Sequence, residues 1–321
     1  MVLLALAADP RSVQSQRSAP AQIHSLQIHS LKVTVLSTML AGDDAGIGEW
    51  GFAALVEADG KRILLDTGAR PGTVLQNAAE LKIDLSDVKE VVLTHNHPDH
   101  VGGLLTLQKE MAKKNPAALS IAHVSRGIFF SRPAPRGEAN VMISVKKEFE
   151  AGGGRFIERD SGAEIFPGAW LSGPVPRKFP ERNWGDRGKV QTPAGLVEDT
   201  IPEDQSLVLH TPQGMVLVTG CGHAGVINIL TFVHDQFPNE PVLAIVGGLH
   251  LYAASDEQLE WTAGKLKEFK VANILGAHCT GIEAVYRIRE LLGLKRQSAV
   301  VGTVASTFVL GEGIHTGPLA R

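Results

Sequence analysis

Three histidines and an aspartate fall within six consecutive residues, 95–100, which read His-Asn-His-Pro-Asp-His. Residues 90–94 before this run have the apolar character of a buried strand, and residues 101–114 after it have apolar residues at helical spacing. The polar run is therefore expected on a turn from a strand into a helix, where α/β proteins often carry functional residues. One carboxylate and three imidazoles crowded at such a turn are costly to remove from water unless a cation binds them.

The order of these side chains predicts two cation positions. Alternate residues of an extended turn point in the same direction, so His95 and His97 can bind one cation. Pro98 redirects the chain, which presents Asp99 and His100 to a second cation. Imidazole and carboxylate donors suit zinc, iron and manganese. The sequence therefore predicts two divalent transition metal ions as cofactors, and we favour zinc over iron or manganese.

The rest of the chain predicts an α/β fold with two similar halves. The expected strands lie at residues 32–36, 52–56, 62–66 and 90–94 in the first half, and at 206–210, 215–219, 242–246 and 273–275 in the second. Helical spacing marks residues 72–82, 101–114, 225–237 and 256–269. Three second-half strands lead into short glycine-containing loops that each hold one histidine, namely His223, His250 and His278. Packing alone explains three such loops poorly.

Residues 117–202 differ from the rest, because prolines and the run Gly152-Gly153-Gly154 divide them into short segments. We expect a loop-rich insertion there. Its many arginines and lysines fit either a solvated surface or the rim of an anion-binding cleft. Arg177 is the best candidate for an anion contact, because nearby prolines restrict its backbone and a guanidinium holds a carboxylate or phosphate through two parallel hydrogen bonds.

The composition limits the partners of the protein. The chain has 321 residues with 31 Lys and Arg against 34 Asp and Glu, so it lacks the basic footprint of a nucleic-acid-binding protein. No apolar run approaches the ~20 residues of a membrane span. We therefore expect a cytoplasmic protein that acts on a small molecule, and an anionic one if the cations of residues 117–202 face the site. Residues 1–30 are expected to be a flexible extension, with a cleaved targeting segment as the alternative.

Residues 94–100, followed by Gly102-Gly103 and preceded by Leu-Asp-Thr-Gly at 65–68, resemble the metal-binding motif of the metallo-β-lactamase superfamily. A narrower branch, the dihydropterin-ribofuranosylaminobenzene phosphate synthases, is similar in four further segments, which are residues 202–206, 220–225, 247–251 and 278–281. The resemblance implies an αββα sandwich in which residues 31–321 form a single domain. It also implies a binuclear metal site at one edge of the sandwich.

The same resemblance implies a role for each histidine loop. The first metal would be bound by His95, His97 and His223. The second metal would be bound by Asp99, His100 and His278. Asp66 would orient a ligand imidazole by accepting a hydrogen bond from its other ring nitrogen.

Cys221 is a departure from the superfamily, because many members have an aspartate there that bridges the two metals. The thiol fits three roles: a bridging thiolate, a neutral group beside the ligands, or a bystander in a site bridged by hydroxide alone. We favour the neutral group. His250 also fits three roles, as a metal ligand, an acid that acts on substrate, or a packed histidine, and we favour the acid.

These residues predict a metal-dependent hydrolase. A metal-activated hydroxide forms near neutral pH and attacks an ester, lactone, thioester or phosphoester, whose oxygen the other metal polarises. Asp99 accepts a proton, and His250 or Cys221 assists the leaving group. There are two alternatives. One is a synthase that joins a pterin-like ring to a phosphoribosyl arene, as the branch resemblance implies, and the other is a non-catalytic metal-binding sensor with an occluded site.

Overall fold

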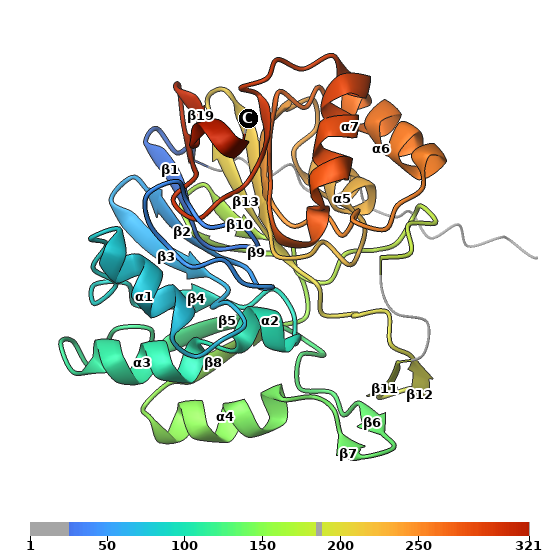
Figure 1. Ribbon diagram of the computed structural model, residues 1–321. Helices are drawn as coiled ribbons and strands as arrows, with labels where there is room; N and C mark the ends of the chain where they lie inside the picture. The colour runs from blue at the N-terminus through green and yellow to red at the C-terminus, as the bar shows by residue number, and fades with distance from the viewer. Residues whose placement is uncertain (1–25, 184–187, 321) are drawn as a thin grey trace, which may run out of the picture.

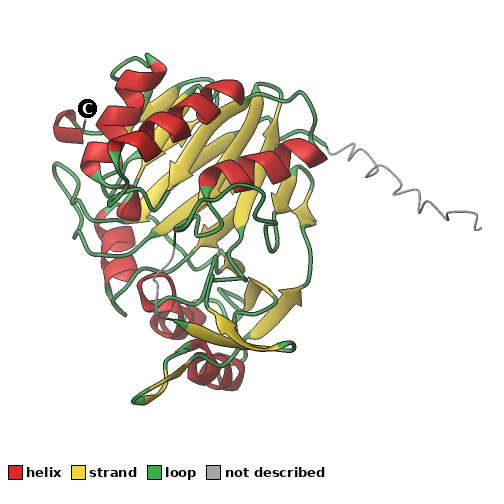
Figure 2. Cartoon of the chain, turned by 90° about the vertical axis from the view of Figure 1, so that its right-hand side faces the viewer, coloured by secondary structure: helices red, strands yellow, loops and turns green. Residues whose placement is uncertain are grey.

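Two β-sheets lie face to face in the computed structural model, which describes residues 26–183 and 188–320 (Figure 1). Within this part of the chain, the first sheet has eight strands in the order β19-β18-β1-β2-β3-β4-β5-β8, and the second has seven in the order β17-β16-β15-β14-β13-β10-β9. Helices cover the outer face of each sheet. Figure 2 views the molecule from the side of α5, α6 and α7, which lie across the second sheet. The architecture is an αββα sandwich.

The first layer combines the N-terminal half of the chain with its C-terminal strands. Its sheet consists of β1 (Leu31–Ser37), β2 (Ala53–Ala58), β3 (Lys61–Leu65), β4 (Glu90–Val92), β5 (Ile121–Ser125), β8 (Arg155–Arg159), β18 (Thr307–Val309) and β19 (Gly313–His315). Its helices are α1 (Thr73–Glu80), α2 (Pro98–Val101), α3 (Leu104–Ala112) and α4 (Met142–Ala151). Strands β3, β4, β5 and β8 run parallel, so their carboxyl ends meet at one edge of the sheet.

The second layer is built from the C-terminal half. Its sheet consists of β9 (Ala163–Phe166), β10 (Ala169–Leu171), β13 (Ser206–Thr211), β14 (Gly214–Thr219), β15 (Val242–Gly247), β16 (Asn273–Gly276) and β17 (Ala299–Val301). Its helices are α5 (Val226–Gln236), α6 (Asp256–Glu268) and α7 (Ile282–Leu292). Two short hairpins lie outside both sheets, formed by β6 (Pro133–Ala134) with β7 (Gly137–Glu138) and by β11 (Lys189–Thr192) with β12 (Gly195–Glu198).

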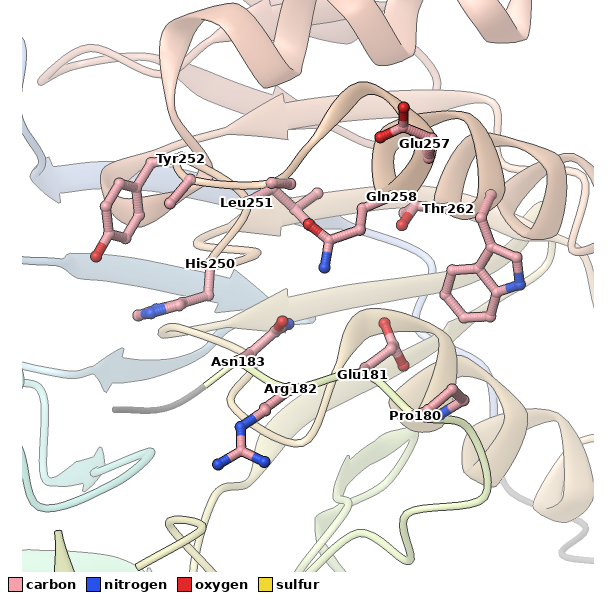
Figure 3. A pocket seen from close by; sticks show the side chains of 13 residues that line it. Pro180, Glu181, Arg182, Asn183, His250, Leu251, Tyr252, Glu257, Gln258 and Thr262 are labelled. Carbon is pink, nitrogen blue, oxygen red and sulfur yellow. The ribbon is translucent and has the colours of Figure 1, made fainter. Parts of the chain in front are cut away.

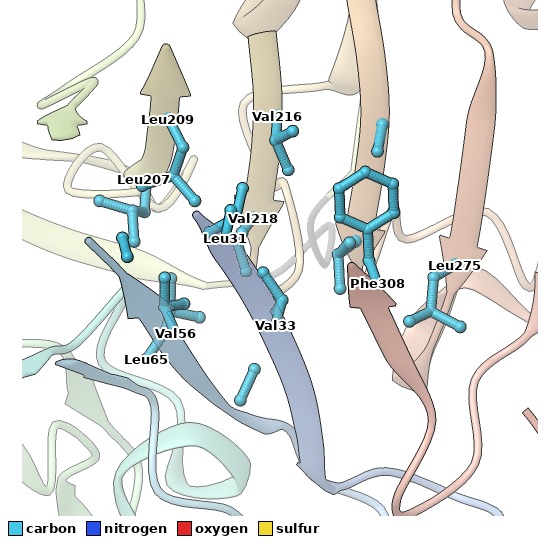
Figure 4. Close-up of a cluster of buried hydrophobic side chains, with 14 of the residues drawn as sticks. Leu31, Val33, Val56, Leu65, Leu207, Leu209, Val216, Val218, Leu275 and Phe308 are labelled. Carbon is cyan, nitrogen blue, oxygen red and sulfur yellow. The ribbon is translucent and has the colours of Figure 1, made fainter. Parts of the chain in front are cut away.

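Buried apolar side chains fill the space between the layers. The group between the two sheets includes Val33, Val56 and Val218 (Figure 4). A second group lies between the second sheet and α5 to α7 and includes Ile229, and a third lies between the first sheet and α1, α3 and α4 and includes Leu107. Full burial of such a side chain is worth about 1.5–3 kcal/mol, so these groups hold the sheet edge that carries the polar loops.

Residues 117–202, predicted to form a loop-rich insertion, also contribute strands to both sheets. Strands β5 and β8 extend the first sheet, and β9 and β10 extend the second. Their short spans and mixed burial, as in β8, conceal the alternation that would have marked them as strands. The prolines fall between these strands: Pro133 lies in a small hairpin, Pro167 in the turn between β9 and β10, and Pro174 after β10.

The folded chain also begins earlier than Leu31. Ile28 is fully buried, and its amide donates a hydrogen bond to the carbonyl of His210 at 2.8 Å. The predictions of a flexible extension or a targeting segment otherwise concern residues 1–25, which lie outside the described residues. None of the helices in the described residues combines the length and the apolar character needed to cross a membrane.

Candidate metal centre

The predicted ligands come together at one edge of the sandwich, although they are far apart in the sequence. Residues 95–100 follow β4 and run into α2, where Pro98 takes the first helical position that its ring suits. The loops with His223, His250 and His278 follow β14, β15 and β16, which are parallel neighbours in the second sheet. Parallel pairing places the ends of these strands side by side, and so brings their loops to the same edge.

His95, His97 and His223 form the first triad, in which one potential ligand atom from each residue lies within 4.8 Å of the others. The ring centroid of His95 lies 4.5 Å from that of His97 and 4.7 Å from that of His223. The Nε2 atoms of His95 and His223 are buried and have no hydrogen-bond partner. Buried nitrogens without partners are costly, and a cation between the rings would satisfy them.

Asp99, His100 and His278 form the second triad, with ligand atoms that also lie within 4.8 Å of one another. An Oδ2 atom of Asp99 lies 3.2 Å from Nε2 of His278 and 3.9 Å from Nε2 of His100. The donor set therefore combines a carboxylate oxygen with two imidazole nitrogens, which suits a divalent transition metal. The two triads together bring into proximity the six residues that the resemblance implied as ligands.

Asp66 connects the two triads. Its Oδ2 lies 2.7 Å from Nδ1 of His100 and accepts a hydrogen bond from the hydroxyl of Thr94 at 2.7 Å. The same hydroxyl lies 3.0 Å from Nδ1 of His95, so it accepts from that ring while it donates to Asp66. Both rings therefore direct a protonated Nδ1 to an acceptor, which turns Nε2 toward the other predicted ligands.

His223 is fixed by a backbone group instead of a carboxylate. Its Nδ1 donates to the carbonyl of Asn183, which again leaves Nε2 facing the first triad. Sequence reasoning missed this contact because a backbone carbonyl leaves no residue-type signal. It also missed Thr94, whose hydroxyl connects Asp66 to His95.

The loops around the centre have unusual backbone conformations. Asp66, His250 and His278 have positive φ angles of 56°, 51° and 47°, which non-glycine residues rarely adopt. Strained residues of this kind gather at functional sites, where the surrounding structure holds them in place. Gly248 is required for close loop packing, because a Cβ there would lie 2.1 Å from the carbonyl oxygen of Gly220.

Burial sets the charge of the first triad. It lowers the pKa of His97 to about 4 and holds the pKa values of His95 and His223 well below their usual range. Neighbouring imidazoles lower the pKa of His95 further. The three rings are therefore neutral at pH 7, which is the form of histidine that binds metal.

The second triad is more polar. Burial raises the pKa of Asp99, but the hydrogen bond from His278 and the charge of His100 hold it below its usual range overall. Burial lowers the pKa of His100, but the adjacent Asp66 carboxylate raises it to about 9 overall. With this pKa the ring of His100 carries a second proton at pH 7. A cation at Nε2 would take the place of that proton, and Asp66 would stabilise the positive charge in either case.

Both cysteines of the chain lie at this centre. The Sγ of Cys221 is 3.1 Å from Nε2 of His100 and 3.3 Å from the Sγ of Cys279. Cys221 and Cys279 are buried, with exposed fractions of 2% and 0%. The sequence assigned Cys279 no specific ligand or catalytic role, although its position directly after His278 indicates that it follows the same strand to the same edge.

A cavity of about 450 Å³ extends from His250 to helix α6 (Figure 3). Its walls include Tyr252, Trp261, Gln258 and Asn183. His250 also lines a second opening, of about 470 Å³, over Asp99, His278 and both cysteines, so it stands between the first cavity and the predicted metal ligands. Its Nδ1 is buried and has no hydrogen-bond partner. Small-molecule sites commonly have this form, with apolar walls and a few polar groups.

Arg177 is placed beside the centre but faces the chain itself. Its guanidinium donates to the carbonyl oxygens of His223, Thr200 and Ile201. These bonds tie the segment 177–183 to the loop that holds His223. An anion at Arg177 would compete with these carbonyls, and its predicted contact with substrate stays a prediction.

Comparison with known proteins identifies the fold family. The family model described as the metallo-beta-lactamase superfamily matches residues 51–278. The chain belongs to the metallo-β-lactamase superfamily. This confirms the superfamily and the αββα sandwich that the sequence predicted, and proteins of this fold usually bind divalent metals.

Named relatives within the superfamily have different activities. Over 267 residues the chain is 27% identical to a Methanocaldococcus jannaschii protein named 7,8-dihydropterin-6-methyl-4-(beta-D-ribofuranosyl)-aminobenzene-5'-phosphate synthase, and the match covers 80% of this chain and 90% of that protein. The solved structure of Tm1679, described as a metal-dependent hydrolase of the β-lactamase superfamily, is 29% identical with a TM-score of 0.67 and covers 83% of this chain and 94% of its own. Zn²⁺-bound PqqB from Methylobacterium extorquens shares the fold, with a TM-score of 0.52 at 14% identity over 86% of this chain and 99% of its own.

Proposed function

We propose that this metallo-β-lactamase-fold protein is a metal-dependent hydrolase of a small ester, lactone, thioester or phosphoester. The observation that carries the proposal is the pair of ligand triads around Asp66, next to a cavity of about 450 Å³ that His250 borders. Two divalent ions, with zinc favoured, would supply hydroxide near neutral pH and polarise the oxygen of the scissile group.

The chain's own residues have distinct tasks in this proposal. Asp99 is a ligand with an exposed side-chain fraction of 20%, so it can accept a proton at the mouth of the site. His250 lies between the cavity and the triads, and its unpartnered Nδ1 is available to donate a proton to a leaving group. Cys221 lines the opening over Asp99 and lies against His100, and it is the weaker candidate for such a donor.

The exposed aromatic residues near the site support binding of a small organic substrate. Trp50 packs edge-on against Tyr252 with ring centroids 5.7 Å apart, and it lies 4.8 Å from the ring of His278. Trp50 is 50% exposed and Tyr252 is 55% exposed. Large apolar rings left exposed beside polar ligands provide a surface on which a ligand can stack.

A synthase that joins a pterin-like ring to a phosphoribosyl arene is the second candidate. It is favoured by the 27% identity to the Methanocaldococcus jannaschii synthase over 90% of that protein. A non-catalytic metal-binding sensor is the remaining alternative from the sequence, and the cavity beside His250 argues against an occluded site.

The test is an activity panel on purified protein loaded with zinc, iron or manganese. Lactones, esters, thioesters, phosphomonoesters and phosphodiesters are assayed for hydrolysis, and dihydropterin with a phosphoribosyl arene is assayed for a condensed product by mass spectrometry. Hydrolysis that is lost in His97→Ala and Asp99→Ala supports the main proposal. A condensed product without hydrolysis would replace it with the synthase, and inactivity with bound metal on every substrate would favour the sensor.

A further inference from the structure

The two cysteines of the chain form a buried pair, although 58 positions separate them in the sequence. Their Sγ atoms lie 3.3 Å apart, which is contact distance for two sulfur atoms. Cys221 follows β14 and Cys279 follows β16, and the strand between these two, β15, ends at Gly247. The sheet therefore brings both thiols to the edge where the metal ligands gather.

The sulfur atoms lie among ligand atoms of both triads. The Sγ of Cys221 is within 4.8 Å of nitrogens of His95 and His100, which belong to different triads. The Sγ of Cys279 forms a similar group with Cys221 and His278. Cys221 is therefore placed between the two metal positions, and Cys279 is on the side of the second.

The packing around the pair is that of a built site. Both cysteines line the opening over Asp99, and the loop at Gly248 fits closely around the pair. A Cβ at residue 248 would lie 2.8 Å from the Sγ of Cys279. Thiols that served only to fill the core would be expected among apolar side chains instead of beside a carboxylate and imidazoles.

The positive charge of two metal ions at the centre would also require further anionic ligands. Among the described residues, Asp99 is the one carboxylate in the groups of possible ligands, and the remaining ligands of both triads are imidazoles. Two divalent cations carry four positive charges, which Asp99 and the buried Asp66 carboxylate beside His100 offset only in part. A metal-bound thiol gives up its proton, so each cysteine would supply one negative charge at the place where it is needed.

We propose that Cys221 and Cys279 are metal ligands: the Sγ of Cys221 bridges the two metal positions, and the Sγ of Cys279 binds at the second position with His278. The centre then has nitrogen, oxygen and sulfur ligands and selects thiophilic ions such as zinc and cadmium over manganese or magnesium. This replaces the neutral role favoured for Cys221 from the sequence, because the contact of Cys279 with Cys221 was not predicted. The inference concerns ion binding alone, so it stands or falls independently of the proposed hydrolysis.

The experiment follows sulfur-to-metal charge transfer in the full chain. The chain contains only these two cysteines, so any such absorption must arise from them. The reduced, metal-free protein is titrated with Cd²⁺ or Co²⁺ in wild type, Cys221→Ser, Cys279→Ser and the double variant, while ion content is measured by mass spectrometry. We expect a charge-transfer band in wild type, a weaker band in each single variant and none in the double variant.

Metal selectivity and thiol protection give two independent measurements. The ratio of Cd²⁺ to Mn²⁺ affinity should fall by about tenfold or more in the double variant, since thiolates favour the softer ion. Bound zinc should protect both thiols of wild type from alkylation, and a chelator should restore their reaction. Cys221→Ala and Cys279→Ala variants are compared with the serine variants, and their thermal unfolding distinguishes loss of a ligand from misfolding.

Wild type that binds two ions without a charge-transfer band would overturn the proposal. Thiols that react equally with and without zinc would overturn it as well. If the charge-transfer band is weaker in Cys221→Ser but unchanged in Cys279→Ser, Cys279 is not a ligand and the proposal for the pair fails. X-ray absorption of the zinc form should show sulfur at about 2.3 Å, the usual Zn–S distance.

Discussion

The two triads hold their ligands in different ways. The first triad is entirely imidazole, and His95 and His223 are oriented by neutral groups, the Thr94 hydroxyl and the Asn183 carbonyl. The second triad contains the Asp99 carboxylate, and the buried Asp66 carboxylate orients His100 directly. The proposed first metal position is therefore fixed by neutral hydrogen bonds, and the proposed second position by charge.

This difference predicts that the two positions respond to different substitutions. Loss of a neutral hydrogen bond should weaken the first position moderately, because a backbone contact is worth about 1 kcal/mol net. Loss of a buried charge should affect the second position more, because it leaves a partner desolvated without compensation.

Removal of one ligand from each triad should separate the two positions. His97→Ala is expected to lose the first ion and keep the second, and Asp99→Ala is expected to do the reverse. In each variant the bound metal measured by mass spectrometry should fall from two ions per chain to about one, and turnover should fall by orders of magnitude. Ion-dependent stabilisation in thermal unfolding should shrink too, because binding to the folded state adds RT ln(1 + [L]/Kd). Unchanged stoichiometry in both variants would contradict the ligand assignment.

Asp66→Asn should weaken the second position next most strongly. An amide at residue 66 would present its NH₂ group to the donors of His100 and Thr94. This removes the acceptor that orients the ring of His100 directly and the ring of His95 through Thr94. Loss of such an outer partner commonly costs 10–100-fold in metal affinity. Competition with a chelating dye should show the larger loss at the second position, since His95 depends on Asp66 only through Thr94.

Asp59→Asn is the matched control for this change. Asp59 is an exposed carboxylate that also accepts several hydrogen bonds, in this case from the backbone amides of His29 and Ser30. It is far from the ligands in the sheet, at the turn between β2 and β3. Equal loss of metal in the two variants would show that the effect of residue 66 is general destabilisation.

Arg177→Ala should affect the first position more mildly. Its guanidinium donates to the carbonyl of His223, so its removal should loosen that ligand and leave carbonyls unpaired, at a cost of about 1–3 kcal/mol in unfolding free energy. We expect lower affinity at the first position, an unchanged second position, and similar changes in KM for neutral and anionic substrates. A rise in KM confined to anionic substrates would instead support the anion contact predicted from the sequence.

The sequence predicted most of the regular structure whose pattern is local. The strands at residues 31–37, 53–58 and 61–65 and the helix at 256–268 agree with the predicted segments to within a few residues. The strands β8 and β18 were missed, because each is short and pairs with a distant part of the chain. Register with a remote strand leaves no periodic pattern in a segment of three to five residues.

The site divides in the same way. The run at residues 95–100 showed its chemistry directly, because four candidate ligands, three histidines and one aspartate, fall within six residues. The grouping of His223 and His278 with it came from the family resemblance, since no local pattern connects loops that follow different strands. The contact of Cys279 with Cys221 and the carbonyl of Asn183 were not predictable, because both depend on how three loops pack at one sheet edge.

Glu181→Gln should have the smallest effect and a distinctive pH dependence. The Glu181 carboxylate accepts from the amides of Ile227 and Asn228 in the first turn of α5, at 3.1 and 2.8 Å. Burial nevertheless raises its pKa from 4.5 to about 7. Between these values the folded state holds the proton more tightly than the unfolded state, so wild type should lose stability as the pH rises from about 4.5 to 7.

Glutamine does not titrate, so Glu181→Gln lacks this loss. The unfolding free energy of wild type minus that of the variant should therefore decline across that pH window and become constant above it. Urea unfolding of the metal-free protein at several pH values measures the difference without the pH dependence of ion binding. A difference that rises with pH would mean that the two amide hydrogen bonds at the start of α5 outweigh burial. Segment 177–183 would then support His223 through the charge of Glu181, which would remove the distinction between a neutral first position and a charged second one.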